Sequence, residues 1–297
     1  MKLEINNEIF PWHRVLFNKI EELKSRGSLP HALALCSKEG WGEAQLLSMT
    51  CNILLGYERH VEASTQANTN FMWVSPEGSV IKIDQIRRVI DFAYKTGQKE
   101  HYKVIAISQG HLLNMNAANA LLKVVEEPPV GTVIVLQTSR WASLPTTLRS
   151  RFHRLTPDLS PVGARKWLDN EGVNLSDVEY SEIGYAPLHA ESYQAQGFGG
   201  FLGVMRVGKV SDIVDQVLTL DCVAWLGNWY RFLLGRLAIK SEQTESLDFT
   251  KVFDFCDELV ATRKEIEMSN SANKRLLLER LIVDWRNQSI DALTDPN

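Results

Sequence analysis

The sequence predicts an α/β fold built on a parallel sheet and followed by helical domains. Two short runs rich in Val and Ile, Lys103–Ile107 and Thr132–Gln137, have the length and composition of buried strands. Between them, Asn114–Glu127 repeats apolar residues at the spacing of one helix face. Either Asn114 or Asn116 can cap its start, and a double proline ends it. A strand, a helix and a strand joined by short turns form a parallel crossover unit.

Length and charge limit the function classes. A chain of 297 residues with 44% hydrophobic and 23% charged residues predicts a globular protein of two or three domains. The formal charge of −4 gives no overall basic footprint. Tight nucleic-acid binding by this chain alone is therefore not indicated, although the total charge leaves a local basic face open.

The cysteines predict neither a metal site nor a disulfide framework. No two of the four are spaced as C-x-x-C, so they are expected to be buried thiols in a reducing compartment: Cys36, Cys51, Cys222 and Cys256. No apolar run approaches the roughly eighteen residues of a membrane span. The first residues carry acidic and amide side chains, unlike a signal peptide. We expect a cytoplasmic protein with no membrane partner, no cofactor and no metal.

The first elements have the order of a phosphate-binding site. Pro11–Arg26 is predicted to be a helix that Gly27 ends, and His31–Cys36 is predicted to be a short buried strand. A glycine turn and a helix through Leu54 follow. A strand, a glycine turn and a helix are the setting of a loop that binds phosphate at a helix N-terminus.

The loop itself lacks the chemistry of an ATP site. The pattern G-x-x-x-x-G-K-[ST] places its lysine on the β- and γ-phosphates and its hydroxyl on magnesium. Here Ser37 stands for the first glycine, Gly40 and Gly42 remain, Glu43 replaces the lysine and Ala44 replaces the hydroxyl residue. We therefore expect a degenerate loop kept as scaffold, with no bound nucleotide.

A further strand and helix follow in the α/β part. Phe71–Gly78 is predicted to be a strand and a turn, and Ile81–Gly97 a helix with Asp84 as its N-cap. Arg87 and Arg88 lie off the apolar face of that helix. They could meet DNA or a partner, but solvated charges are the more common explanation.

The strand ends also lack catalytic acids. A working ATPase has an aspartate for magnesium and a glutamate that orients water after the strand Lys103–Ile107. This chain has Ser108 and Gln109 there. Thr138 follows the next strand, and two interpretations stay open for it: a sensor of nucleotide, or a hydroxyl that satisfies backbone groups at the strand end.

The run NAANALLKVVEEPP, the strand ending in Thr138 and Ser139, and the motif LPTTLRSRF resemble the AAA+ clamp-loader family. In that family a Ser-Arg-Cys motif supplies an arginine to ATP bound on a neighbouring subunit. This chain has Ser150, Arg151 and Phe152, so the cysteine is replaced and the arginine is kept. The resemblance implies that Arg151 is an arginine finger acting in trans, with Ser150 as its motif neighbour.

The resemblance covers nearly the whole chain and implies a function. It implies a subunit of the bacterial DNA polymerase III clamp loader that does not hydrolyse ATP and helps load the sliding clamp on primed DNA. Its partners would be ATPase subunits of the tau/gamma type, a delta-type subunit, the clamp and primer-template DNA. The isolated chain would not be an enzyme. At the position of an arginine that the family uses to sense the γ-phosphate, this chain has His189. Where the family often has a four-cysteine zinc module, this chain has the short polar segment Leu55–Asn70, in which His60 is expected to be a surface histidine.

The resemblance and a change of character after Pro157 predict three parts. These are an AAA+ α/β domain over 1–157, a small helical lid over 158–205 and an all-α collar domain over 206–297, with a break at Gly197–Gly203. The predicted helices beyond the sheet are Ser160–Glu171, Leu175–Gly184, Leu218–Leu237 and Asn273–Asn287. Leu218–Leu237 is apolar nearly all round, so it is either the core of a small bundle or a helix shared with other subunits.

Two other functions compete with this interpretation. One is an ATP-hydrolysing motor subunit of the same loader, against which Glu43, Ser108 and Gln109 argue. The other is a pure scaffold or DNA-binding adaptor that keeps an AAA+ fold and has lost the loader function.

Overall fold

The computed structural model describes residues 9–57, 63, 69–95, 102–196, 205, 207–240, 249–268 and 272–287. The chain forms two compact units, one ending at Trp167 and the other beginning at Leu168. Each unit is considered by itself below. The division into three domains, with a lid and a collar, remains a prediction.

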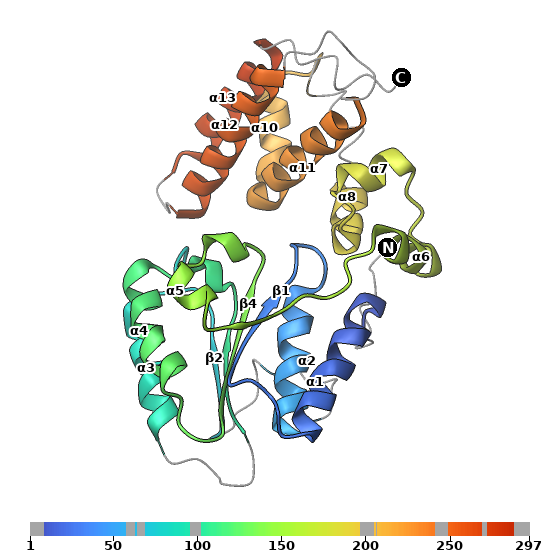
Figure 1. Ribbon diagram of the computed structural model, residues 1–297. Helices are drawn as coiled ribbons and strands as arrows, with labels where there is room; N and C mark the ends of the chain where they lie inside the picture. Colours follow the sequence, from blue (N-terminus) through green and yellow to red (C-terminus); the bar gives the residue numbers. More distant parts are fainter. Residues whose placement is uncertain are drawn as a thin grey trace. The chain divides into compact units, whose positions relative to one another are not determined.

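The first unit is built on a five-stranded parallel sheet (Figure 1). Its strand order is β2-β3-β4-β1-β5. The strands are β1 (Ala32–Cys36), β2 (Phe71–Val74), β3 (Lys103–Ile107), β4 (Thr132–Thr138) and β5 (His153–Leu155). The three central strands are buried along their whole length, as their apolar runs predict. The edge strand β5 was not predicted, because it has three residues and two of them are exposed.

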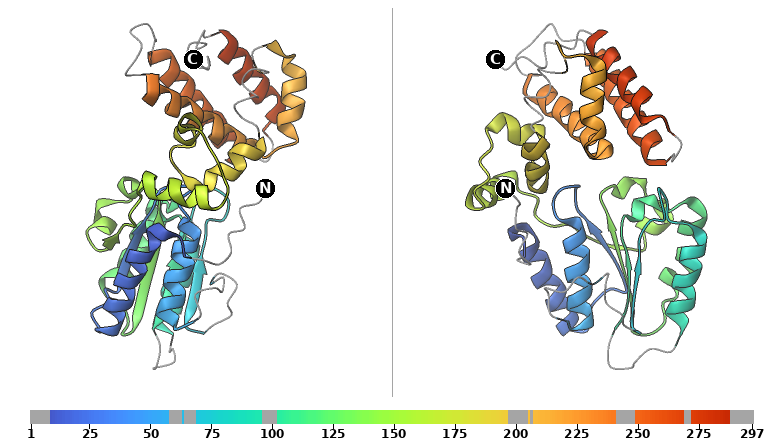
Figure 2. Two further views of the ribbon diagram at one scale, coloured as in Figure 1. Left: turned by 90° about the vertical axis from the view of Figure 1, so that its right-hand side faces the viewer. Right: turned by 180° about the vertical axis from the view of Figure 1, so that it is seen from behind.

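Helices cover both faces of this sheet, as the right-hand view of Figure 2 also shows. On one face α1 and α2 pack over a core that includes Phe17, Leu33 and Leu46. On the other, α3 and α4 pack over a core that includes Val89, Leu121 and Ile134. The helices are α1 (Arg14–Ser25, preceded by the 3-10 turn Pro11–His13), α2 (Glu43–Leu55), α3 (Ile83–Tyr94) and α4 (Met115–Glu126). The predicted parallel crossover unit is thus confirmed.

Two helix starts test the predicted caps. Of the two asparagines predicted as possible caps of α4, Asn114 is the cap, since its side-chain oxygen accepts a hydrogen bond from the backbone N–H of Ala117 at 2.8 Å. The prediction of Asp84 as the cap of α3 is wrong. The helix begins earlier, where Gln85 Oε1 accepts from the backbone N–H of Lys82 at 2.9 Å. Asp84 instead pairs with Arg87 on the exposed side of the first turn.

Lys103 ties the sheet to the end of α3. Its residue is only 7% exposed, and its Nζ donates to the carbonyl oxygens of Phe92 at 2.9 Å, Ala93 at 3.3 Å and Lys95. The last carbonyls of a helix lack partners in a following turn, although the carbonyl oxygen of Phe92 also accepts from the backbone N–H of Lys95 at 3.3 Å. A cation there also opposes the negative end of the helix dipole. Burial, and to a smaller extent the charge of Lys95, lowers the pKa of Lys103.

Replacing Lys103 by methionine should therefore destabilise the first unit. We expect a loss of about 1–2 kcal/mol, because charged hydrogen bonds to the helix end disappear while the apolar stem is kept. Urea unfolding monitored by circular dichroism measures this loss. The exposed Lys123 in the last turn of α4 provides the control, and Lys123→Met should change stability by less than about 0.5 kcal/mol. Equal effects of the two substitutions would contradict the capping role.

The second unit is helical throughout its described part. Its α-helices are α7 (Asp177–Glu182), α8 (Ala190–Gln196), α10 (Val210–Leu218), α11 (Cys222–Lys240), α12 (Phe249–Met268) and α13 (Lys274–Asn287). The helix α6 (Pro161–Asn170) crosses the boundary between the units. The helix predicted over Leu218–Leu237 starts too early in the sequence, because α10 ends at Leu218 and α11 begins only at Cys222. Just before α11, the side chain of Asp221 accepts hydrogen bonds from Val223 N and Ala224 N. The helix α12 was not singled out from the sequence.

The tryptophans of α11 form the core of a bundle. Trp225 and Trp229 lie 5.1 Å apart between ring centroids, and Trp229 lies 5.2 Å from Phe255 of α12 and 5.5 Å from Trp285 of α13. All four side chains are at most 1% exposed. Of the two interpretations of this helix, a bundle core accounts for the tryptophan stripe.

Several predictions concern absences or other parts of the chain. All four cysteines are free and buried, as predicted. No described helix has the length and apolar character needed to cross a membrane. The described residues hold no group of three or more His, Cys, Asp and Glu side chains suited to a metal ion. His60, Gly97 and the break at Gly197–Gly203 lie outside the described residues.

Candidate functional site

The sheet brings the predicted loop and the predicted strand-end residues to one edge. Because β1, β3 and β4 are neighbouring parallel strands, their carboxyl ends lie together. Cys36, the last residue of β1, is level with Thr138, the last residue of β4. The backbone N–H of Ser37 then donates to the carbonyl oxygen of Thr138 at 3.2 Å. The loop therefore starts beside the end of β4.

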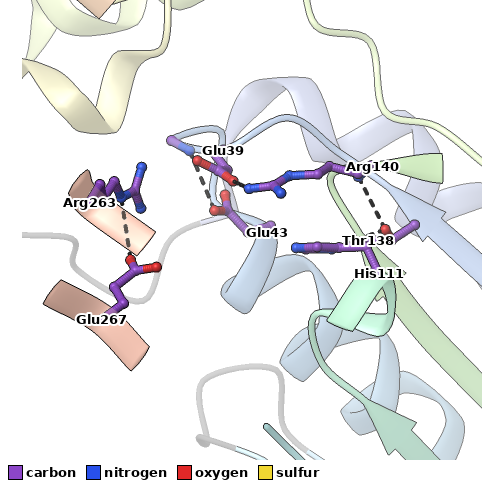
Figure 3. A network of polar contacts seen from close by, with 8 residues as sticks. Glu39, Glu43, His111, Thr138, Arg140, Arg263 and Glu267 are labelled. Carbon is purple, nitrogen blue, oxygen red and sulfur yellow. Dashed lines mark hydrogen bonds and ion pairs between the residues drawn. The ribbon is translucent and has the colours of Figure 1, made fainter. Parts of the chain in front are cut away.

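The side chain of Glu43 folds back onto this loop. Gly42 has a φ of +79° and begins α2, so Glu43 is the first residue of that helix. Its Oε1 accepts a long hydrogen bond of 3.4 Å from the backbone N–H of Gly40 (Figure 3). A backbone N–H of such a loop is the kind of donor that binds phosphate oxygens elsewhere. Here a carboxylate of the chain itself receives it.

The surroundings of Glu43 disfavour its charge. Burial, the main cause, raises the pKa of the carboxyl above its ordinary value. The backbone N–H groups of Glu43, Gly40 and Trp41 oppose this rise, and the charge of Glu39 adds to it. Ala44, the next residue, has no side-chain oxygen for magnesium. The residue types at these two positions fit a nucleotide–magnesium complex poorly.

Aromatic rings fill the space beside the loop. We call Phe10, Trp12, Trp41 and Trp167 the aromatic cluster. Phe10 stacks on Trp12 with centroids 4.9 Å apart, and both rings meet Trp167 edge-on at 5.5 and 5.4 Å. Trp12 Nε1 also donates to the carbonyl oxygen of Trp41 at 2.8 Å. A Cβ atom on Gly42 would come within 2.5 Å of the Phe10 ring, so the cluster packs directly on the loop.

The end of β3 has no acidic group where an ATPase needs one. Ser108 Oγ donates to the carbonyl oxygen of Val74 on the neighbouring strand at 3.3 Å. Gln109 has a φ of +50°, a left-handed conformation that non-glycine residues seldom adopt, and its N–H donates to Gln137 Oε1 at 3.0 Å. Both residues thus take part in contacts between strand ends.

A second set of polar residues, which the sequence did not single out, surrounds Thr138. Its hydroxyl accepts from the backbone N–H of Arg140 at 3.1 Å and lies 3.2 Å from His111 Nδ1. The Arg140 side chain reaches Glu39 of the loop, with 3.6 Å between Nη2 and Oε1 (Figure 3). Burial, with the charge of Arg140, lowers the pKa of His111, and Glu39 opposes this. Of the two interpretations of Thr138, the contact with Arg140 N is the one expected of a hydroxyl at a strand end.

Arg151 lies next to the end of α4. It follows the short helix α5 (Thr146–Arg149) and is held by three oxygen atoms. Its Nη1 donates to the carbonyl oxygen of Thr147 at 2.8 Å and lies 3.4 Å from Ser150 Oγ. Its Nη2 pairs with Glu126 Oε1 at 2.5 Å. The Arg151 side chain remains 38% exposed, so part of the guanidinium faces solvent.

Comparison with known proteins finds relatives among the subunits of DNA polymerase III. The family model described as DNA polymerase III, delta subunit, matches residues 12–157. The DNA polymerase III subunit delta' of Pseudomonas aeruginosa is 24% identical over 94% of this chain and 97% of that protein. The subunit delta' of Yersinia pestis is 34% identical over 48% of this chain and 46% of that protein. This chain is thus similar to DNA polymerase III delta' subunits over most of its length.

A solved structure agrees with the fold of this chain. The DNA polymerase III gamma subunit-related protein of Thermotoga maritima is similar with a TM-score of 0.50 and 21% identity, covering 91% of this chain and 99% of that one. At this identity the likeness concerns the fold alone. The predicted class, an AAA+ α/β domain followed by a helical part, is confirmed, and so is the resemblance to clamp-loader subunits.

One residue that the sequence analysis singled out, His189, lies in the second unit. His189 ends the 3-10 turn Pro187–His189 and stands where the sequence resemblance leads one to expect an arginine. Tyr185, four residues earlier, has a φ of +57°. The roles of His189, the degenerate loop and Arg151 remain predictions.

Proposed function

We propose that this chain is a subunit of the DNA polymerase III clamp loader that does not bind or hydrolyse ATP and that supplies Arg151 to a neighbouring ATPase subunit. Its partners on this proposal are ATPase subunits of the tau/gamma type, a delta-type subunit, the sliding clamp and primer-template DNA. Similarity to delta' subunits of DNA polymerase III supports the assembly. The observation that carries the non-hydrolysing role is the Glu43 carboxylate at the lysine position, directed onto the loop.

Electrostatics support this role for the loop. At about 4 Å and an effective dielectric constant near 20, a like-charge pair costs roughly 4 kcal/mol. A triphosphate would therefore lose the attraction of a lysine and meet the repulsion of Glu43. It would also compete with that carboxylate for the N–H of Gly40.

The other parts of an ATPase are missing as well. Ala44 supplies no oxygen to magnesium, and Ser108 and Gln109 supply neither an aspartate nor a glutamate. Phosphoryl transfer depends almost entirely on positioning and electrostatic stabilisation. The loss of several of these groups together therefore lowers catalysis more than the loss of any one of them. The rival function of an ATP-hydrolysing motor subunit is disfavoured for this reason.

The isolated chain is expected not to bind ATP. Calorimetric titration with magnesium ATP should give no binding heat, whereas a loader ATPase subunit of the tau/gamma type should give a clear isotherm under the same conditions. Glu43→Lys restores one positive charge but none of the magnesium ligands, so its ATP turnover should equal that of the unmodified chain. Micromolar binding by the unmodified chain, or turnover created by Glu43→Lys alone, would overturn the proposal.

Assembly is tested separately. The chain should co-purify with the other loader subunits and support clamp loading on primed DNA. A chain that failed to enter the complex would instead favour the adaptor function. This experiment does not depend on the ATP titration, so the two parts of the proposal can fail independently.

A further inference from the structure

The guanidinium of Arg151 is fixed by acceptors from two different elements. Thr147 O belongs to α5, only four residues away, while Glu126 is the last residue of α4 and lies 25 positions earlier in the chain (151 minus 126). Acceptors in two directions fix both the position and the plane of a guanidinium, whose donors form a rigid fork. These contacts engage both terminal nitrogens of the guanidinium and leave more than a third of the side chain exposed.

The position of Glu126 is not explained by the stability of its own helix. A carboxylate in the last turn of a helix faces the negative end of the helix dipole, which is unfavourable. A cationic side chain, such as lysine, would suit position 126 better. The close pairing with Arg151 offsets this disadvantage. The contact thus accounts for an acid at a position where helix physics favours a base.

The neighbouring arginine is held differently. Arg149 Nη2 donates to the hydroxyl of Thr146 at 3.1 Å, a contact within the same short helix. A hydroxyl of the same turn fixes the group less firmly than an anion on another element does. The structure therefore distinguishes the two arginines of the motif by their acceptors, and the pairing with Glu126 belongs to Arg151.

We infer that Glu126 is a positioning residue, whose carboxylate orients the Arg151 guanidinium so that its exposed edge can engage the phosphate oxygens of ATP on a neighbouring subunit. This inference rests on the proposed function of Arg151. A free arginine side chain has many rotamers, and holding it in one geometry lowers the entropy lost when it engages the phosphate. The exposed edge keeps donors for this purpose.

The expected effect is modest because the pair is half exposed. Pairs of this kind have measured couplings that correspond to changes of about two- to fivefold in a rate or equilibrium constant. Glu126→Ala should lower the turnover of the neighbouring ATP site by about this factor, with the KM for ATP nearly unchanged. Glu126→Gln keeps an acceptor oxygen and should restore turnover towards that of the unmodified complex.

The test is a double-mutant cycle in the reconstituted loader, with DNA-stimulated ATPase measured as kcat and KM. The four complexes carry the unmodified chain, Glu126→Ala, Arg151→Ala and both substitutions. If Glu126 acts through Arg151, then Glu126→Ala lowers kcat only while Arg151 is present. The adjacent, exposed Glu127 is the control, and Glu127→Ala should leave kcat unchanged.

The outcomes separate this inference from the proposed function. If Arg151→Ala lowers kcat but Glu126→Ala does not, or if Glu126→Ala lowers kcat equally in both backgrounds, the positioning role is wrong and the proposed function stands. If Arg151→Ala has no effect, the proposed function fails and the inference fails with it. If Glu126→Ala does not fold or assemble, Glu126→Gln and Glu126→Ser are compared in its place, and serine should show the larger loss.

Discussion

Arg151→Ala is expected to reduce DNA-stimulated ATP hydrolysis and clamp loading by the assembled loader. A supplied arginine stabilises charge that develops on the transferred phosphoryl group, and it contributes about 10³–10⁵ in rate in the GTPase systems in which it has been isolated. Only one ATP site among several receives this arginine, so the total activity should fall without disappearing. Steady-state ATPase and fluorescence-detected clamp loading measure the two losses.

Folding and assembly should survive the same substitution. The ion pair between Arg151 and Glu126 is partly exposed, with 38% and 45% of the two side chains accessible, and pairs of this kind contribute under about 1 kcal/mol. Arg149→Ala is the matched control, being of the same charge and two residues away. Normal loading by the Arg151→Ala complex would contradict the role in trans. A larger defect in Arg149→Ala would show that the finger has been assigned to the wrong arginine.

The stability of the first unit should fall between pH 6.5 and pH 4 because of His13. This side chain is fully buried against Phe10, Trp12 and Phe17, with ring centroids 5.7–6.1 Å away. Burial lowers the pKa of His13 from 6.5 to about 4, while the Trp41 backbone and the Gln45 side chain oppose the shift. Because its folded pKa is depressed, the unfolded chain binds a proton first as the pH falls.

The expected loss is about 3 kcal/mol over this range, of which about 2 kcal/mol appears by pH 5. His13→Phe has an apolar ring of similar size and no proton to bind, so its stability should depend much less on pH. Urea unfolding at pH 7.5, 6.5, 5.5 and 5 measures the difference between the variants. His153, exposed on β5, serves as the control, and His153→Gln should keep the pH dependence of the unmodified chain. Parallel curves for the unmodified chain and His13→Phe would contradict this account.

The central elements of the fold were predictable because each has a local signal. The strands β3 and β4 are continuous apolar runs, and α4 lies between an asparagine cap and two prolines. Elements with weaker signals were missed. The edge strand β5 needs only three residues because β1 supplies its partner groups. The start of α3 depends on Gln85 reaching back to Lys82, and lysine is not a residue that predicts a cap.

The candidate site was predictable in its residue types but not in its contacts. The absence of a lysine, a hydroxyl and two acids can be read from the loop and strand-end positions. The aromatic cluster cannot, because its members come from positions 10, 12, 41 and 167 and meet only in the folded unit. The pairing of Arg151 with Glu126 is of the same kind: the sequence places each residue in its motif, but no local pattern joins them.

The aromatic cluster stabilises the loop with side chains of the protein itself, whereas a nucleotide-dependent subunit relies on its bound ligand. A protein that binds a ligand only when folded gains stability that rises with ligand concentration, so its conformational equilibrium follows the supply of that ligand. Here buried rings and the Trp12–Trp41 hydrogen bond support the loop from within the chain. On the proposed function, the first unit would keep one shape whether the cell is rich in ATP or in ADP. It would present Arg151 to its neighbour as a fixed surface throughout the cycle of the motor subunits.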